Sequence, residues 1–128
     1  MTEIPADLKM YAIVYQPALK KMGGNRGKLG AQQGHAYLHA FWDAEEHHPA
    51  RAKAYKHSGA AKKITLVCED EDLMRALAKD YRAICGTTVV EDAGLTVFKG
   101  EKTFTMVGIG PLAPQERDER LASLPPLI

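Results

Sequence analysis

Residues 9–16 read Lys-Met-Tyr-Ala-Ile-Val-Tyr-Gln, a nearly continuous run of apolar, β-branched and aromatic side chains. Such a run is typical of a central strand that is covered on both faces, and Pro17 ends it. The next segment, 17–27, is rich in lysine and glycine, and we predict a loop there. A helix is expected over about 28–47, because small and apolar residues recur in it at helical spacing and Pro49 stops it.

The rest of the chain alternates between helical and strand patterns. One helix is expected between Asp70, which can cap its N-terminus, and Gly86, which favours its end. The residues expected on its buried face are Leu73, Leu77, Tyr81 and Ile84. The other predicted elements are a short helix over 50–57, strands over 63–68, 87–91 and 103–109, and a last helix that begins at Pro114.

This alternation of strands and helices predicts an α/β layered fold. The link Asp92-Ala93-Gly94 between the third and fourth strands is too short for a crossover helix. Those two strands should therefore be antiparallel, and the sheet mixed. With 128 residues, of which 45% are hydrophobic, the chain can bury one core, and we expect a single domain over residues 1–128.

The composition also bears on the compartment in which the protein works. No stretch approaches the roughly 18 consecutive apolar residues of a membrane span, so we expect no membrane association. The N-terminal residues lack the basic and apolar regions of a secretory signal. Cys68 and Cys85 are too few for a disulfide scaffold and are not spaced as CxxC. We therefore predict a cytoplasmic protein with two reduced thiols.

The segment Gly23-Gly24-Asn25-Arg26-Gly27-Lys28 lies between a predicted strand and a predicted helix, where backbone amides often bind phosphate. It does not match the Walker A loop of nucleotide-triphosphate sites. Three residues rather than four separate Gly23 from Gly27, and Leu29 follows the lysine. The segment is either a flexible basic loop or one that contacts an anion or RNA.

The helix that follows carries a polar stripe. Lys28, Gln32, His35 and His39 are spaced so that they share one helix face. The two histidines have the i, i+4 spacing of zinc ligands, but Ala36 stands where an HExxH motif has glutamate, so we predict no metal. We expect the histidines to be partly buried and hydrogen-bonded instead.

Asp92 follows the third strand, Thr96 comes four residues later, and Thr105 lies in the facing strand. The Asp92 carboxylate either caps the turn or serves as a general base that activates or orients water, and the pattern leaves both open. The segment Gly108-Ile109-Gly110 lacks the third glycine of a dinucleotide-binding fingerprint. Its glycines instead allow another segment to approach the backbone closely.

Several short blocks occur in order between residues 9 and 111. They are Lys9-Met10, Met22-Gly23, Gly27-Lys28, Ala31-Gln32, His35-Ala36, Gly59, Asp92-Ala93-Gly94, Thr96, Thr105 and Gly108-Ile109-Gly110-Pro111. In order and in the spacing within each block, the chain resembles the type II peptidyl-tRNA hydrolases of archaea and eukaryotes.

The resemblance implies a single three-layer α/β/α domain around a mixed four-stranded sheet, in a protein that is usually a homodimer. It implies cleavage of the ester that joins a peptide to the 3′ end of tRNA, without metal or cofactor. It assigns Lys28, Asp92, Thr96 and Thr105 to the catalytic site, and Gln32 and His35 to substrate binding beside it.

The sequence differs from the family's pattern at several positions. Leu95 and Val97 stand where the family has arginine and glutamine, and Gln16-Pro17 stands where its first strand runs into arginine and aspartate. We therefore keep a second interpretation, a weak or inactive relative that binds tRNA or a protein. A third is a hydrolase of another acyl ester or amide.

The chemistry fits the residue types. Ester hydrolysis needs a positioned water, a proton acceptor and a group that stabilises the developing oxyanion. Asp92 can accept the proton and Lys28 can neutralise the oxyanion and keep Asp92 ionised. Both are expected at strand ends that meet in one crevice of an open α/β sheet. No serine or cysteine is paired with a histidine in a recognisable motif, which disfavours a covalent acyl-enzyme.

The charge is distributed unevenly along the chain. Residues 1–68 hold ten lysines and arginines against five acidic residues, whereas 69–128 hold seven against eleven. A surface that binds a polyanion should therefore draw on the first half. The residues expected to contact tRNA are Lys20, Lys21, Arg26 and Lys28, with Arg51, Lys53, Lys56, Lys62 and Lys63 as an extension. The residues that suggest a homodimer are the apolar side chains Tyr37, Leu38, Phe41 and Trp42 on the first long helix.

Overall fold

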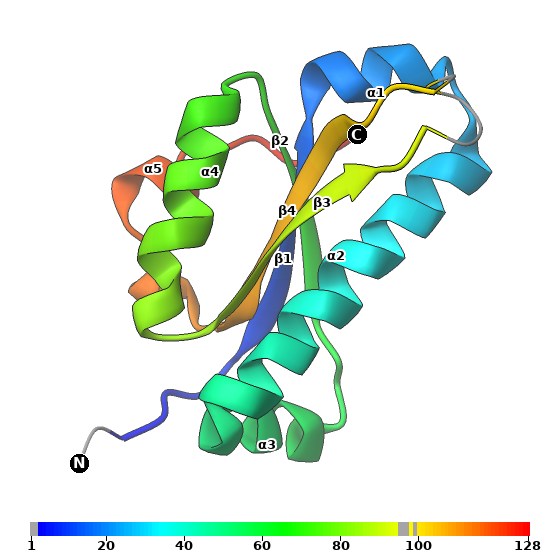
Figure 1. The fold of residues 1–128 in the computed structure, drawn as a ribbon. Coiled ribbons are helices and arrows are strands. Elements are labelled where there is room, and N and C mark those ends of the chain that lie inside the picture. Colours follow the sequence, from blue (N-terminus) through cyan, green and yellow to red (C-terminus); the bar gives the residue numbers. More distant parts are fainter. Residues whose placement is uncertain (1–2, 95–97, 99) are drawn as a thin grey trace.

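The computed structural model describes residues 3–94, 98 and 100–128 and shows a four-stranded sheet with strand order β2-β1-β4-β3 (Figure 1). β1 pairs in parallel with β2, while the β1–β4 and β3–β4 pairs are antiparallel. The predicted mixed sheet is confirmed. The strands are β1 (Lys9–Tyr15), β2 (Lys63–Cys68), β3 (Gly86–Asp92) and β4 (Thr103–Leu112).

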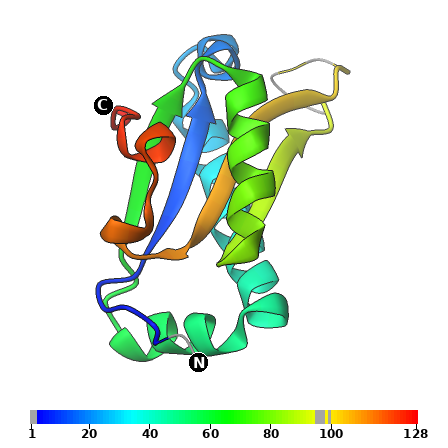
Figure 2. The same ribbon diagram turned by 90° about the vertical axis from the view of Figure 1, so that its left-hand side faces the viewer.

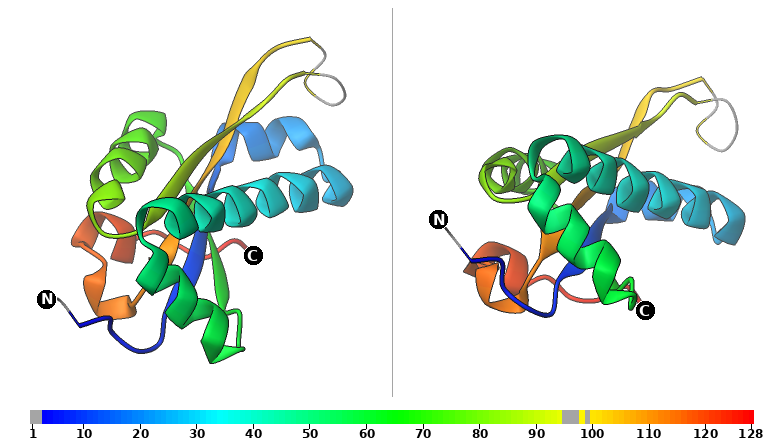
Figure 3. Two further views of the ribbon diagram at one scale, coloured as in Figure 1. Left: turned by 60° about the horizontal axis from the view of Figure 1, so that its bottom comes forward. Right: turned by 90° about the horizontal axis from the view of Figure 1, so that it is seen from below.

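Helices cover both faces of the sheet and make three layers, as Figures 1 and 2 show. α2 lies across one face and α3 turns back from its end (Figure 3), while α4 and α5 cover the other face. The helices are α1 (Gln16–Met22), α2 (Arg26–His47), α3 (Pro49–Ser58), α4 (Glu71–Asp80) and α5 (Glu119–Ala122), with short 3₁₀ turns at Tyr81–Ala83 and Pro114–Glu116. No described helix is both long and apolar enough to cross a membrane.

The central strand β1 contributes side chains to the hydrophobic clusters on both faces of the sheet. Side chains alternate across a strand, and Tyr11 and Ile13 pack with α4 and α5 residues such as Leu77. Their neighbours Ala12 and Val14 pack against α2 instead. The run of apolar residues in this strand is therefore buried on both faces, as its sequence predicts.

α2 lies unusually close to the sheet because two strand residues facing it lack side chains. Its buried residues Gln32, Ala36, Ala40 and Ala44 recur every four positions. A Cβ atom built on Gly108 of β4 would lie 2.2 Å from the carbonyl oxygen of Ala36. One built on Gly86 of β3 would lie 2.0 Å from that of Ala40. This close packing confirms the expected role of Gly108 and fixes the depth of α2.

Gly108→Ala should lower the free energy of unfolding by about 3 kcal/mol, because β4 is paired on both sides and cannot move away from α2. Denaturant titration measures this loss. Gly30→Ala is the matched control, since a Cβ there meets no atom within 4 Å. It should raise stability by about 0.5–1 kcal/mol through helix propensity. Equal stability of the two variants would contradict this account of α2.

The prediction of a loop over 17–27 is wrong for the first half of this segment, where α1 forms. Pro17 occupies the first turn of α1, where its missing N–H is tolerated. Ala18 and Met22 are buried, and Gly23 ends the helix in the left-handed conformation, with φ 57°. The lysines and glycines that suggested a loop instead form the exposed face and the C-terminal end of this short helix.

Three further boundaries differ from the sequence-based expectations. β4 continues through Gly108 to Leu112 rather than closing near Ile109. Ile84, expected in the buried face of α4, is 37% exposed because α4 ends at Asp80. The helix expected from Pro114 is a 3₁₀ turn, and α5 follows three residues later.

Candidate active site

An ion pair between Lys28 and Asp92 joins the two segments that the sequence singled out. The Lys28 ammonium contacts Oδ1 of Asp92, and the two side chains are only 14% and 8% exposed. Lys28 stands in the first turn of α2, whose N-terminus is capped by Asn25 through a 2.9 Å hydrogen bond from the Lys28 backbone amide. Asp92 is the last residue of β3. The structure thus brings together residues 64 positions apart.

Gln32 connects the ion pair to Thr105. The Thr105 hydroxyl donates to Gln32 Oε1 at 2.8 Å, and Gln32 Nε2 donates to Asp92 Oδ1 over a longer 3.4 Å. Gln32 and Thr105 are buried, so each polar end of the glutamine needs a partner inside the protein. The donor and acceptor ends of Gln32 match Asp92 and Thr105 in this orientation only, which holds the carboxylate in place.

An irregularity in the sheet turns Thr105 toward this site. Val90 pairs with Met106, but the next residue, Glu91, pairs with Phe104, so Thr105 is an extra residue in β4. Such a β-bulge breaks the alternation of side chains. The bulge places Thr105 on the α2 side of the sheet, where the Val90 carbonyl oxygen also lies 3.1 Å from its hydroxyl and shares the single hydroxyl proton with Gln32 Oε1.

Asp92 also caps the turn that follows it. Its second oxygen, Oδ2, accepts a 2.8 Å hydrogen bond from the backbone amide of Gly94. The turn cap and the ion pair coexist because each uses one carboxylate oxygen. The two roles that the sequence left as alternatives for Asp92 are therefore geometrically compatible.

Asp92 is held as a carboxylate. Burial is the largest single influence and raises the pKa of Asp92, but the Lys28 ammonium and the Gly94 amide together outweigh it. The electrostatic influence of His35 also lowers the pKa of Asp92. The net result is an Asp92 pKa below its usual value of 3.8. At neutral pH the site therefore contains an ionised acceptor facing an ammonium.

Phe98 and α1 support Lys28 from outside the predicted motifs. The Lys28 ammonium lies 5.7 Å from the centre of the Phe98 ring, within the range of a cation–π interaction. Phe98 is buried against Ala18 and Met22 of α1. Neither α1 nor the role of Phe98 was predicted from the sequence, and the one available signal was an aromatic residue in the connection between the third and fourth strands.

The structure places the other predicted site residues less centrally. Thr96, with Leu95 and Val97, lies outside the described residues. His35 and His39 are exposed, which corrects the expectation that they are partly buried. They form a row with Trp42, on which His39 stacks at 5.3 Å between ring centres. Among the described residues, no group of three His, Cys, Asp or Glu side chains is arranged to hold a metal ion.

The basic residues divide into two groups. Lys20, Lys21 and Arg26 are exposed at the junction of α1 and α2, next to Lys28. The proposed extension is not brought to this site, because it belongs to α3 and the start of β2. Within it, Arg51 is ion-paired with Glu116 and Lys62 with Asp7.

Comparison with known proteins agrees with the resemblance. The family model for peptidyl-tRNA hydrolase PTH2 matches residues 8–127. A peptidyl-tRNA hydrolase of Methanopyrus kandleri is 38% identical over 102 residues, which cover 79% of this chain and 85% of that protein. One from Methanocaldococcus jannaschii is 31% identical over 100 residues, covering 78% and 83%. Human mitochondrial peptidyl-tRNA hydrolase 2 is 32% identical over 94 residues, covering 71% of this chain and half of the human protein. The chain therefore belongs to the PTH2 family of peptidyl-tRNA hydrolases.

Proposed function

We propose that this protein is a peptidyl-tRNA hydrolase in which water, activated by Asp92, cleaves the ester between a peptide and the 3′ end of tRNA. The observation that carries the proposal is the Lys28–Asp92 pair, held by Gln32 in a chain of this family. Water adds its oxygen to the ester carbonyl, the carbon–oxygen bond to the ribose breaks, and the products are a peptide carboxylate and a tRNA hydroxyl. Asp92 takes the proton from the water and returns it to the leaving ribose oxygen.

Lys28 can serve Asp92 and the substrate together. An ammonium has three N–H donors, and the contact with Asp92 uses one. Another can bind the oxyanion that forms on the ester carbonyl, where it stabilises the transition state. As Lys28 turns toward the oxyanion, its hold on Asp92 weakens and the carboxylate becomes a stronger base.

The buried amide Gln32 acts as a positioning residue in this proposal, because both ends of its side chain are occupied by Asp92 and Thr105. Thr105 fixes Gln32 in turn. His35, exposed one turn further along α2, and Thr96, on the strength of the family resemblance, are proposed to contact the substrate or its water. Direct attack by a cysteine is disfavoured, because Cys68 and Cys85 are buried and burial raises the pKa of Cys85 to about 12.

The proposed activity is tested by incubating the purified protein with N-acetylated aminoacyl-tRNA and following release of the acyl group. Deacylation that is unchanged by EDTA is expected, since the proposed steps use side chains and water. A protein that binds this tRNA but leaves the ester intact would instead be the inactive, tRNA-binding relative. Loss of activity in EDTA would favour a metal-dependent mechanism.

We further propose that tRNA phosphates bind the exposed cluster Lys20, Lys21 and Arg26. Each phosphate contact releases counterions, so binding should weaken as salt rises from about 50 to 200 mM. Replacing all three residues by glutamine should weaken tRNA binding and flatten its salt dependence. The control replaces Lys53 and Lys79, two exposed lysines on α3 and α4. Affinity that does not depend on salt would contradict this contact.

A cytoplasmic homodimer is proposed as the working form, by resemblance to the family. The exposed apolar side chains on α2 support an interface there, because Leu38 and Trp42 are 46% and 53% exposed. Tyr37 and Phe41 are partly buried against the chain's own core, which leaves them a smaller role. Light scattering at tens of micromolar should give twice the 14.1 kDa chain mass. A mass of one chain, or an unchanged dimer when Leu38 and Trp42 become arginine, would contradict this interface.

A further inference from the structure

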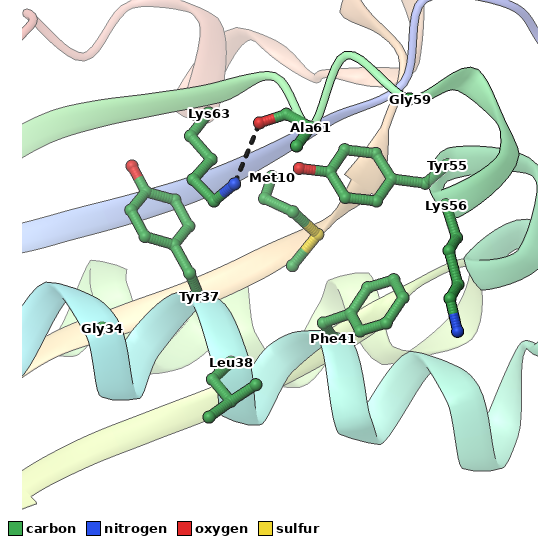
Figure 4. A pocket seen from close by; sticks show the side chains of 10 residues that line it. All are labelled: Met10, Gly34, Tyr37, Leu38, Phe41, Tyr55, Lys56, Gly59, Ala61 and Lys63. Carbon is green, nitrogen blue, oxygen red and sulfur yellow. Dashed lines mark hydrogen bonds between the residues drawn. The ribbon is translucent and has the colours of Figure 1, made fainter.

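A groove of about 460 Å³ lies between α2, α3 and the segment that leads into β2. Met10 forms its floor, Tyr37 and Phe41 rise from α2, and Tyr55 faces them from α3, as Figure 4 shows. Met10 is near the start of β1, whereas the Lys28–Asp92 pair lies beyond the other end of that strand. Along the strands the groove and the active site are thus about six residues apart, or about 20 Å.

The walls of the groove expose apolar surface and few free hydrogen-bonding groups. The Tyr37 hydroxyl is hydrogen-bonded to Thr65 Oγ1 at 2.6 Å. The Tyr55 hydroxyl donates to the Lys62 carbonyl at 3.0 Å. With their polar ends already satisfied, both tyrosines present ring faces. In Figure 4 Met10 lies between the two tyrosine rings, and the Phe41 ring lies beside that of Tyr55, 5.8 Å between ring centres. Such a lining suits an apolar ligand part.

The charge at the rim of the groove has one sign. Lys56 and Lys63 are its charged lining residues, and none of the ten lining residues is acidic. Lys63 Nζ donates to the Ala61 carbonyl at 2.9 Å and lies 6.0 Å from the Tyr37 ring centre. One contact leaves this ammonium two further N–H donors. The groove therefore combines an apolar interior with positive charge at its edge.

We propose that this groove binds an amphiphilic carboxylate, an acid with an aliphatic or aromatic body. The body packs on Met10, Phe41 and Tyr55, and the carboxylate binds the Lys63 ammonium, with Lys56 adding attraction at the rim. The volume lies within the range of about 300–1,000 Å³ of small-molecule sites. A carboxylate also matches lysine better than a cation or a neutral group does. This site does not depend on the hydrolytic reaction.

Two glycines of α2 allow a matched test of the apolar part. Gly34 lines the groove, and a Cβ there meets no atom within 4 Å. Gly30, one turn earlier and equally open, does not line it. Gly34→Leu should fill the groove and weaken binding of the amphipathic anion 1-anilinonaphthalene-8-sulfonate by about tenfold, because steric overpacking typically has a cost of that order. Gly30→Leu should bind the dye as the unsubstituted protein does.

The charge is tested with decanoate and decyltrimethylammonium as competitors for the dye. Decanoate should displace it and the cation should not. Replacing Lys56 and Lys63 by glutamine should weaken the binding of decanoate. Replacing Lys53 and Lys79 by glutamine should leave the binding of decanoate unchanged. Equal displacement by both competitors, or equal loss of dye binding in the Gly34 and Gly30 variants, would overturn the proposal. Dye binding that appears only when the protein is diluted to single chains would also overturn it, because a second copy would then fill the groove.

Discussion

Asp92→Asn is expected to lower kcat/KM for N-acetylated aminoacyl-tRNA by about 10²–10⁴-fold, the usual contribution of a general base. The amide has the shape of the carboxylate and its oxygen can still accept the Gly94 hydrogen bond. It cannot take a proton from water. The loss should therefore appear in the chemical step, measured under single-turnover conditions, with tRNA affinity little changed.

A matched control separates catalysis from folding. Asp118 is also a capping carboxylate: it accepts the Leu121 amide and is ion-paired with Arg120, and these contacts lower its pKa. Asp118→Asn removes a comparable carboxylate outside the site and should leave the rate constant unchanged. Turnover near that of the unsubstituted protein in Asp92→Asn would remove Asp92 from the role of base.

Lys28→Ala is expected to cost a comparable factor, about 10²–10³-fold, because it removes the group that faces the developing oxyanion. It should also alter the pH dependence. Activity requires ionised Asp92 and falls as pH drops through the pKa of that carboxyl. Lys28 lowers this pKa while burial raises it, so removing Lys28 should move the acid limb toward higher pH.

The pH–rate profile of kcat/KM measures this shift, and Lys79→Ala on α4 supplies the control for loss of one lysine. Lys28→Met keeps most of the stem that lies near Phe98 and should behave like the alanine variant. An acid limb at the same pH in the Lys28 variants would mean that the lysine does not act on Asp92.

Much of the site follows from the sequence because its parts stand next to strong secondary-structure signals. The sequence predicts Asp92 at the end of a strand and Lys28 at the start of a helix, and β3 and α2 place them there. Parts of the chain that flank an open sheet meet at its edge, so their encounter was predictable from topology alone. β2 was predicted with the bounds that the structure shows.

The role of Gln32 could not be read in the same way. Helical spacing places Gln32 on the same helix face as Lys28. The hydrogen-bond partners of Gln32, however, depend on a β-bulge that the sequence of β4 does not predict. Without the extra residue at Thr105, that hydroxyl would point to the opposite face of the sheet. A buried glutamine that links Thr105 to Asp92 is therefore a consequence of tertiary pairing.

α1 and the role of Phe98 are not predictable from the sequence for a different reason. A seven-residue helix is too short for its buried face to show as a periodic pattern. Its two buried residues, Ala18 and Met22, are recognisable only once Phe98 packs on them. The cluster of Ala18, Met22 and Phe98 that supports Lys28 thus joins two segments of the chain. Each segment alone carries only a weak sequence signal for its structure.

The central claim, that Lys28 and Asp92 act as one unit on the ester, is tested most directly by a double-mutant cycle. Single-turnover deacylation of N-acetylated aminoacyl-tRNA is measured for the unsubstituted protein, Lys28→Ala, Asp92→Asn and the double variant. Groups that act together are non-additive, so the double variant should be little slower than the slower single variant. If the two losses multiply instead, the residues act independently and the account is contradicted.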